Sequence, residues 1–365
     1  MALASGWQQS LSMSRLLIGA SDKTNLLLHF AADDFSRGLL LVDPDGSVAE
    51  ATANTVPKPL LQNVFYLDPS DLNYPFGLNI LDRIPPDERH TLTENICAYF
   101  EAMWPNGWGA QSNFILANCL RILLDTPGST LLGVLKLLTD EGYQKKCLAY
   151  CTDPVVVANW KVICRWDSRQ YQAALAPLQN KIGTLLMSPT LRNIFGQQHS
   201  TFSLAQNKII IANLCRAKIG DLTAFLLGSL LISRSTGPVY INGLGFFSSD
   251  RLAAQSTRTD FTVALDFLDE LTPKLRQAVV QFKEKYVFQT NREDAEKLAF
   301  YVGVANPSLL IDLSPAEYKA LAGEPTIPPA PAFRQQLRGI KKHSRACHTR
   351  RRVGVEQRNA NFLGE

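Results

Sequence analysis

A short run near the start of the chain carries the residue types that hold phosphate. Residues 19–24 (GASDKT) follow an apolar stretch and open a segment of helical spacing. The backbone N–H groups of such a loop, a lysine ammonium and a Ser/Thr hydroxyl are the groups that bind nucleotide phosphates and their Mg²⁺. Thr24 would be the Mg²⁺ ligand. The predicted nucleotide-binding residues are Gly19, Ser21, Lys23, Thr24 and Asn25.

The spacing of this loop departs from the usual phosphate loop, G-x-x-x-x-G-K-[ST]. Here the pattern is G-x-x-x-K-T, which is two residues shorter, and Asp22 replaces the glycine before the lysine. A carboxylate at that position would face and repel the phosphates, and a shorter loop cannot wrap them in the usual way. The alternative interpretation is an ordinary strand-to-helix turn in which Lys23 is solvated.

The elements around the loop alternate between strands and helices. Continuous apolar runs such as residues 38–43 (GLLLVD) indicate strands buried on both faces. This alternation predicts an α/β fold with a mainly parallel sheet. The predicted strands are 16–18, 38–43, 64–68, 208–214, 239–242, 261–266 and 286–289. The predicted helices between them are 24–35, 221–234, 273–283 and 292–302.

The middle of the chain has a different pattern. Residues 84–200 show helical periodicity without β-rich runs, which predicts an all-α insertion. Four prolines, Pro325, Pro328, Pro329 and Pro331, indicate a linker near the end. We therefore expect four segments: the first part of an α/β domain at 1–83, the insertion at 84–200, the second part of the α/β domain at 201–323, and a linker with a basic tail at 324–365.

Charge is concentrated in that tail. The whole chain has a net charge of +4. Residues 331–365 hold nine Lys/Arg and two Glu, or +7, so residues 1–330 carry −3. Guanidinium and ammonium groups suit phosphate contact, and the alternative is a solvated, partly disordered tail. The predicted nucleic-acid-binding residues are Lys341, Lys342, Arg345, Arg350, Arg351 and Arg352. His343, Cys347 and His348 in the same segment offer a further, weaker metal-binding pattern.

Composition excludes several classes of protein. Hydrophobic residues make up 46% and charged residues 19%, which is typical of a globular chain. No apolar run reaches the roughly 20 residues that a transmembrane helix needs, and the start lacks the pattern of a signal peptide. The seven scattered cysteines include no CxxC pair, so we expect reduced thiols and a cytoplasmic location.

The order of the motifs resembles one family. Residues 16–45 resemble a Walker A strand, loop and helix followed by a strand that ends in an Asp-Pro-x-Gly turn. Residues 64–81, 208–228 and 291–298 are similar to further core segments of the hexameric P-loop translocases, which include HerA, FtsK and the TraG/TraD-type coupling proteins of type IV secretion and conjugation. The resemblance implies a RecA-like P-loop NTPase fold, ATP and Mg²⁺ as ligands, and DNA as partner. It also implies a ring of subunits and contact with secretion or conjugation components.

The resemblance also indicates where the chain departs from its family. The family's Walker B strand ends in Asp-Glu, whereas the matching strand here is followed by Asn242-Gly243. The next strand of the family ends in a Gln that senses the γ-phosphate, and Asp266 stands in that place. Asparagine binds Mg²⁺ weakly and glycine cannot act as a base. This predicts a degenerate translocase with weak or no ATPase activity, a pseudo-ATPase, that serves in nucleic-acid binding or assembly.

A second alignment places Walker B at Asp269-Glu270, which follow an apolar run. Asp269 would then hold Mg²⁺ and Glu270 would be the catalytic base of a working ATP-driven DNA translocase. The structural alternative is that the two carboxylates begin the next helix, with Pro273 in its first turn. The third functional hypothesis is an interaction scaffold that binds neither nucleotide nor DNA.

Overall fold

The computed structural model describes residues 14–165, 168–204, 207–255, 260–314, 317–320, 331–332 and 335–364. Its centre is a seven-stranded sheet in the order β3-β4-β2-β5-β6-β1-β7, and all the neighbouring strands pair in parallel. The strands are β1 (Arg15–Ile18), β2 (Leu39–Asp43), β3 (Val64–Leu67), β4 (Ile209–Asn213), β5 (Val239–Ile241), β6 (Phe261–Leu265) and β7 (Glu284–Val287).

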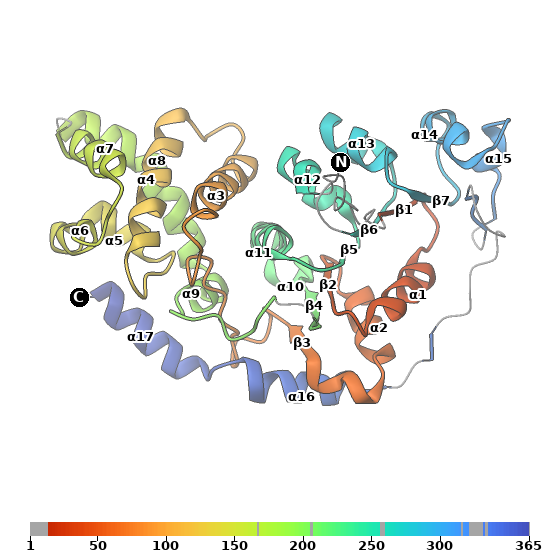
Figure 1. Ribbon diagram of the computed structural model, residues 1–365, viewed down its shortest axis with the longest axis horizontal. Coiled ribbons are helices and arrows are strands. Elements are labelled where there is room, and N and C mark those ends of the chain that lie inside the picture. The colour runs from red at the N-terminus through yellow and green to blue at the C-terminus, as the bar shows by residue number, and fades with distance from the viewer. Residues whose placement is uncertain are drawn as a thin grey trace, which may run out of the picture.

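Helices cover both faces of this sheet (Figure 1). Successive strand residues point to opposite faces, so Leu17 packs in one core while Leu16 and Ile18 pack in the other. The first core lies under α1 (Thr24–Asp34), α2 (Ser47–Thr55) and a helix of the tail, α16 (Leu337–His348). The second core includes residues of α11 (Asp221–Arg234) and α13 (Pro273–Val280). The remaining helices of this lobe are α10 (Arg216–Ile219), α12 (Asp250–Gln255), α14 (Arg292–Leu298), α15 (Ser308–Ile311), η1 (Lys58–Asn63), η2 (Leu244–Phe247), η3 (Leu268–Glu270) and η4 (Ala299–Val302).

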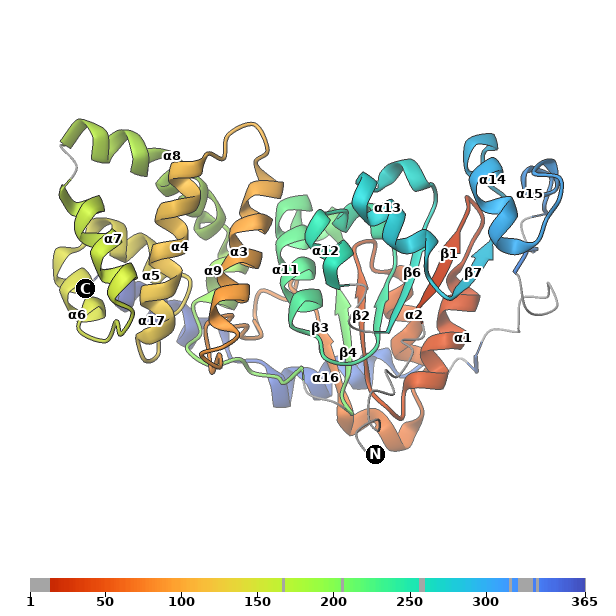
Figure 2. The same ribbon diagram turned by 45° about the horizontal axis from the view of Figure 1, so that its top comes forward.

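A helical lobe is inserted between β3 and β4 and lies beside the sheet (Figure 2). The structure thus confirms the predicted α/β fold with a parallel sheet and an all-α insertion. The lobe consists of α3 (Arg89–Met103), α4 (Ala110–Asp125), α5 (Gly133–Thr139), α6 (Glu141–Leu148), α7 (Pro154–Arg165), α8 (Ser168–Met187) and α9 (Pro189–Phe195).

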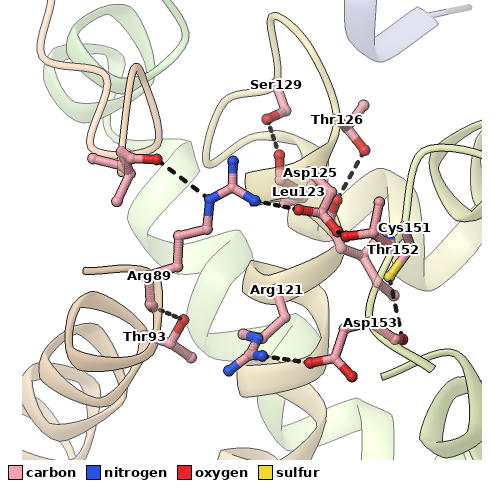
Figure 3. A network of polar contacts seen from close by, with 12 residues as sticks. Arg89, Thr93, Arg121, Leu123, Asp125, Thr126, Ser129, Cys151, Thr152 and Asp153 are labelled. Atoms are coloured by element: carbon pink, nitrogen blue, oxygen red, sulfur yellow. Dashed lines mark hydrogen bonds and ion pairs between the residues drawn. The ribbon is translucent and has the colours of Figure 1, made fainter. Parts of the chain in front are cut away.

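Two arginine–aspartate pairs join the helices of this lobe (Figure 3). Arg89, the first residue of α3, donates to Asp125 at the end of α4. Arg121 of α4 donates to Asp153, the residue before α7, at 2.5 Å. The second carboxylate oxygen of Asp125 accepts the backbone N–H of Thr152 at 2.9 Å. These contacts connect α4 to α3 and to the segment before α7, and so add polar links between helices that also pack through their apolar faces.

The tail forms two helices, α16 (Leu337–His348) and α17 (Arg352–Gly364), that run from the α/β lobe to the helical lobe (Figure 1). The two helices replace the solvated, partly disordered tail considered above. Of the predicted linker, Pro325, Pro328 and Pro329 lie outside the described residues. No helix in the described part of the chain is long and apolar enough to span a membrane. The seven cysteines all lie in the described residues and form no disulfide.

The predicted boundaries of three elements are wrong by two or more residues. Strand β7 covers Glu284–Val287 rather than 286–289, α13 ends at Val280 rather than at 283, and α14 ends at Leu298 rather than at 302, where the 3₁₀ helix η4 follows it. The first three residues of β7 are only half-buried because β7 lies at the edge of the sheet. Its charged residues therefore hide the apolar pattern that identified the other strands.

Candidate nucleotide-binding site

Polar residues gather at the carboxyl edge of the sheet. Because all the strands are parallel, their carboxyl ends meet at one edge, where ligands bind in open α/β sheets. Asp43 and Asn213 are the last residues of the neighbouring strands β2 and β4, and Asn242 follows β5, which pairs with β2 on its other side. Gly19 and Asp266 follow the neighbouring strands β1 and β6. The loop glycine and the predicted Walker B and sensor positions therefore lie along this edge.

Gly19 begins the loop between β1 and α1 in a conformation that favours glycine. Its φ angle is +133°, and a Cβ atom there would lie 2.6 Å from the carbonyl oxygen of Gln289. Its N–H donates to the carbonyl of Leu265 at 3.3 Å, and the N–H of Ala20 donates to Gln289 at 2.8 Å. The loop is therefore fixed to the strands on both sides of β1.

The ammonium of Lys23 folds back into this loop. Nζ donates to the carbonyl oxygen of Gly19, to that of Ser21 at 3.1 Å, and to Oδ1 of Asp266 at 2.8 Å. An ammonium has three N–H donors, so its hydrogen-bonding capacity is used within the protein. Lys23 is only 8% exposed. The interpretation in which Lys23 is solvated is therefore wrong.

Asp22 occupies the amino end of α1. Its Oδ1 accepts the backbone N–H of Thr24 at 2.8 Å. That N–H is one of the free donors at the start of the helix, which in phosphate loops point toward the anion. Asp22 and Asn25 are exposed, and Ser21 and Thr24 are half-buried. The carboxylate of Asp22 thus takes the helix-end position that a phosphate occupies in other loops of this kind.

Asn242, at the predicted Walker B position, is hydrogen-bonded to a buried carboxylate. Its Nδ2 donates to Oδ1 of Asp43 at 3.1 Å, and Asp43 is fully buried. Asp43 also accepts the N–H groups of Asp45 at 3.0 Å and Ala49 at 2.8 Å. Gly243 has a φ of +64° and precedes η2. Asn242 therefore positions the turn after β2, together with Asp43.

Sequence reasoning missed Asp43 as a site residue. The available signal is the Asp-Pro-Asp-Gly turn of residues 43–46, which follows a buried strand. Asp43 reaches Asn242 because β2 pairs with β5. This pairing places Val42 opposite Ile241, so the residues that follow them, Asp43 and Asn242, lie side by side.

Asp269 and Glu270 lie in the 3₁₀ helix η3, before α13 and not inside it. Glu270 accepts the backbone N–H of Phe267 at 2.9 Å, and a Cβ atom on Gly245 would overlap its carboxylate. Partial burial, followed by repulsion from Asp266 and Asp269, raises the pKa of Glu270 above its ordinary value. Glu270 thus serves as a turn-capping group, and Lys23 pairs with Asp266 rather than with either carboxylate of η3.

The basic residues of the tail have two different surroundings. Nζ of Lys341 lies 3.4 Å from Oδ2 of Asp68 and 3.7 Å from Oε1 of Glu50. Nε of Arg345 lies 2.6 Å from Oδ2 of Asp71. Ser344 between them is buried, and its hydroxyl accepts the N–H of Tyr66 at 3.0 Å. Since β3 is the last strand of the sheet, α16 covers an edge that would otherwise expose unpaired backbone groups.

The other predicted nucleic-acid-binding residues differ in their exposure and ion pairs. Lys342, Arg350 and Arg351 are exposed, and within the described ranges no carboxylate forms an ion pair with them. Arg352 pairs with Glu356 of its own helix at 2.8 Å. The six residues therefore do not form one free basic surface.

A parallel sheet whose first strand ends in a glycine loop, with Lys-Thr opening the following helix, defines the class of P-loop NTPase folds. Comparison with solved structures gives the particular relatives. The chain is similar to the bacterial conjugative coupling protein TrwB in an unbound form, with TM-score 0.59 and 13% identity over 90% of this chain and 88% of that chain. It is also similar to the plasmid coupling protein TrwB in complex with ADP and Mg²⁺, with TM-score 0.57 and 13% identity over 90% and 89% of the two chains.

A third similar structure is VirB4 of Thermoanaerobacter pseudethanolicus, with TM-score 0.56 and 9% identity over 89% of this chain and 91% of that chain. These matches confirm the fold that the family resemblance predicted, because they extend over both lobes. No family model matches the sequence, and no curated protein matches it. The similarity of this chain to TrwB and VirB4 is therefore a similarity of fold.

Proposed function

We propose that this chain is a degenerate relative of the coupling-protein translocases, with little or no ATP hydrolysis, that acts as an assembly component of a conjugation, type IV secretion or mobile-element system. One observation carries the proposal. The lysine that would meet the phosphates is buried and makes its three hydrogen bonds to Gly19, Ser21 and Asp266. The chain thus keeps the fold of a nucleotide-binding domain, but the ammonium of Lys23 binds groups of the protein where it would otherwise bind phosphate.

The surrounding residues do not fit a Mg²⁺-nucleotide in this arrangement. A γ-phosphate would have to displace Asp266 from Lys23 and lie beside the carboxylate of Asp22. Like unit charges about 4 Å apart near a protein surface repel by about 4 kcal/mol. At the Walker B position, Asn242 offers an amide that already donates to Asp43. Thr24 is thus left without a carboxylate partner from β5 for holding Mg²⁺.

The similar structures support the assembly role through their fold. TrwB is described as a conjugative coupling protein, and one of its structures holds ADP and Mg²⁺. The match covers 90% of this chain and 89% of that chain, and in this chain α16 and α17 join the two lobes. We infer that selection has kept the shape of the subunit, including surfaces that contact neighbours in a ring or in a secretion complex, without the hydrolytic site.

The test is Mg-ATP turnover by the purified chain, with and without DNA, beside Lys23→Ala. The proposal expects wild-type turnover no higher than that of the variant under either condition. DNA-stimulated turnover that Lys23→Ala removes would contradict it. If that turnover also disappeared in Glu270→Gln, the working translocase that uses Asp269 and Glu270 would replace the proposal. In that case the buried lysine would have to leave Asp266 on nucleotide binding.

A further inference from the structure

Three side chains with metal-ligating atoms meet where α16 ends. His343 and Cys347 are one turn apart and so lie on the same face of the helix, and His348 is its last residue. One ligand atom from each residue lies within 4.8 Å of the other two. Sγ of Cys347 is 3.8 Å from Nδ1 of His343, and the two imidazole rings have centroids 5.8 Å apart. A small inward movement brings the three atoms to the spacing around one metal ion.

The position of His348 supplies a second, independent observation. Its ring lies against Phe65 of the edge strand β3, with centroids 3.9 Å apart, and its carbonyl oxygen accepts the hydroxyl of Thr201 at 2.6 Å. Its Nε2 atom is buried and has no hydrogen-bond partner among the described residues. A buried polar atom without a partner costs free energy, and coordination to a metal would satisfy it.

We propose that His343, Cys347 and His348 form a Zn²⁺ site, with water in the fourth coordination position. Imidazole nitrogen and thiolate sulfur are the ligands that zinc prefers, and three protein ligands with one open position is an established zinc geometry. Cys347 is exposed, so the ion can enter from solvent. On the same helix, Lys341 and Arg345 pair with acidic residues, and solvent screens the charge of the exposed Lys342, so these cations repel the ion weakly.

The site lies where the tail leaves the α/β lobe for the helical lobe. A bound ion would fix the end of α16 against Phe65 and thereby hold the turn that leads into α17. Because the three ligands converge only in the folded arrangement, Zn²⁺ binding stabilises the folded chain by an amount that rises with the logarithm of the free Zn²⁺ concentration above Kd. The proposal is independent of the nucleotide site, since none of its residues contributes to the loop around Lys23.

The experiment uses the reduced full-length chain, freed of metal with a chelator and titrated with Co²⁺ and then Zn²⁺. The proposal expects one Co²⁺ per chain, with the visible bands of tetrahedral cobalt and a thiolate-to-cobalt charge-transfer band, and displacement by Zn²⁺. Cys347→Ser abolishes the charge-transfer band, and His348→Phe, which keeps a ring against Phe65, abolishes 1:1 binding. Cys164→Ser removes another exposed thiol, on α7, and serves as the matched control that retains both signals.

Zinc-dependent melting gives a second measurement. The melting temperature of the wild type and of Cys164→Ser rises with Zn²⁺, whereas that of Cys347→Ser does not. Absence of 1:1 binding by the folded wild type would overturn the proposal, and so would a charge-transfer band unchanged in Cys347→Ser. Because the Cys347 side chain is exposed, we expect Cys347→Ser to fold. The Cys347→Ser result therefore decides the test even if His348→Phe does not fold.

Discussion

The ammonium of Lys23 donates a hydrogen bond of 2.8 Å to the carboxylate of Asp266, which lies 243 positions later in the chain. The bond links the end of β1 to the end of β6, two strands that pair directly. A loop two residues shorter than the usual phosphate loop holds the lysine close to β1, within reach of the neighbouring strand. Asp266, at the position where the family resemblance predicts a γ-phosphate sensor, is thus the counter-ion of Lys23.

We expect Lys23 and Asp266 to be energetically coupled. In a double-mutant cycle with Lys23→Met and Asp266→Asn, the coupling free energy should be about 1 kcal/mol, because Asp266 is 60% exposed and solvent screens the pair. Urea unfolding of the four proteins measures this quantity. Additive effects of the two substitutions would show that the pair contributes nothing to stability.

Docking of the tail should depend on Arg345 and not on Lys342. Arg345 contacts Asp71 and lies over the ring of Tyr74, whereas Lys342 is exposed. Arg345→Ala should therefore destabilise docking by about 1 kcal/mol. Hydrogen exchange at the N–H of Tyr66, which donates to Ser344, should become faster. Lys342→Ala is the matched control, and equal exchange in the two variants would argue against docking through the ion pair.

If the chain binds DNA, the exposed tail residues should carry the contact. Each phosphate contact adds roughly 0.9 to the slope of log affinity against log salt for duplex DNA. Replacing Lys342, Arg350 and Arg351 by alanine should therefore lower that slope by about 2.7. Lys341→Ala should change it little, because Lys341 already pairs with Asp68. A larger effect of Lys341→Ala than of the triple variant would reverse this assignment.

Asp294 should make folding stability depend on pH. It is buried, accepts the N–H of Leu268 at 2.8 Å and so holds η3 in place. Burial, followed by repulsion from Asp269 and Glu293, raises the pKa of Asp294 above its ordinary value, although Leu268 and Lys297 oppose the change. The folded state therefore binds the proton more tightly than the unfolded state. The stability that Asp294 contributes is fully present below pH 3.8, its pKa in the unfolded chain. This contribution is lost as the pH rises through the higher pKa of Asp294 in the folded chain.

Urea unfolding between pH 4 and pH 7 tests this sign. Asp294→Asn keeps an oxygen acceptor for Leu268 and should remove the loss of stability on raising the pH. Glu293→Gln is the control on the same helix, because Lys297 lowers the pKa of Glu293 and its contribution has the opposite sign. A pH profile of Asp294→Asn that matches the wild type would contradict the account of Asp294.

The sequence predicted the parallel sheet because its strands are buried on both faces and appear as apolar runs. The runs at β2 and β6 were placed to within one residue. It could not predict contacts between distant segments. The bond between Ser344 and Tyr66 spans 278 positions, and a serine in a basic helix gives no signal of burial against an edge strand. Likewise, the composition of the tail predicted phosphate contacts, but the positions of Asp68 and Asp71 decide which cations are free.

The central claim is that the loop around Lys23 is closed to nucleotide. The most direct measurement is equilibrium binding of Mg-ATP and Mg-ADP to the purified wild type by calorimetry, with Lys23→Ala as the reference. The account predicts no saturable heat of binding in either protein. Saturable, Mg²⁺-dependent binding to the wild type that disappears in Lys23→Ala would contradict it, because the lysine would then leave Asp266 to meet the phosphates.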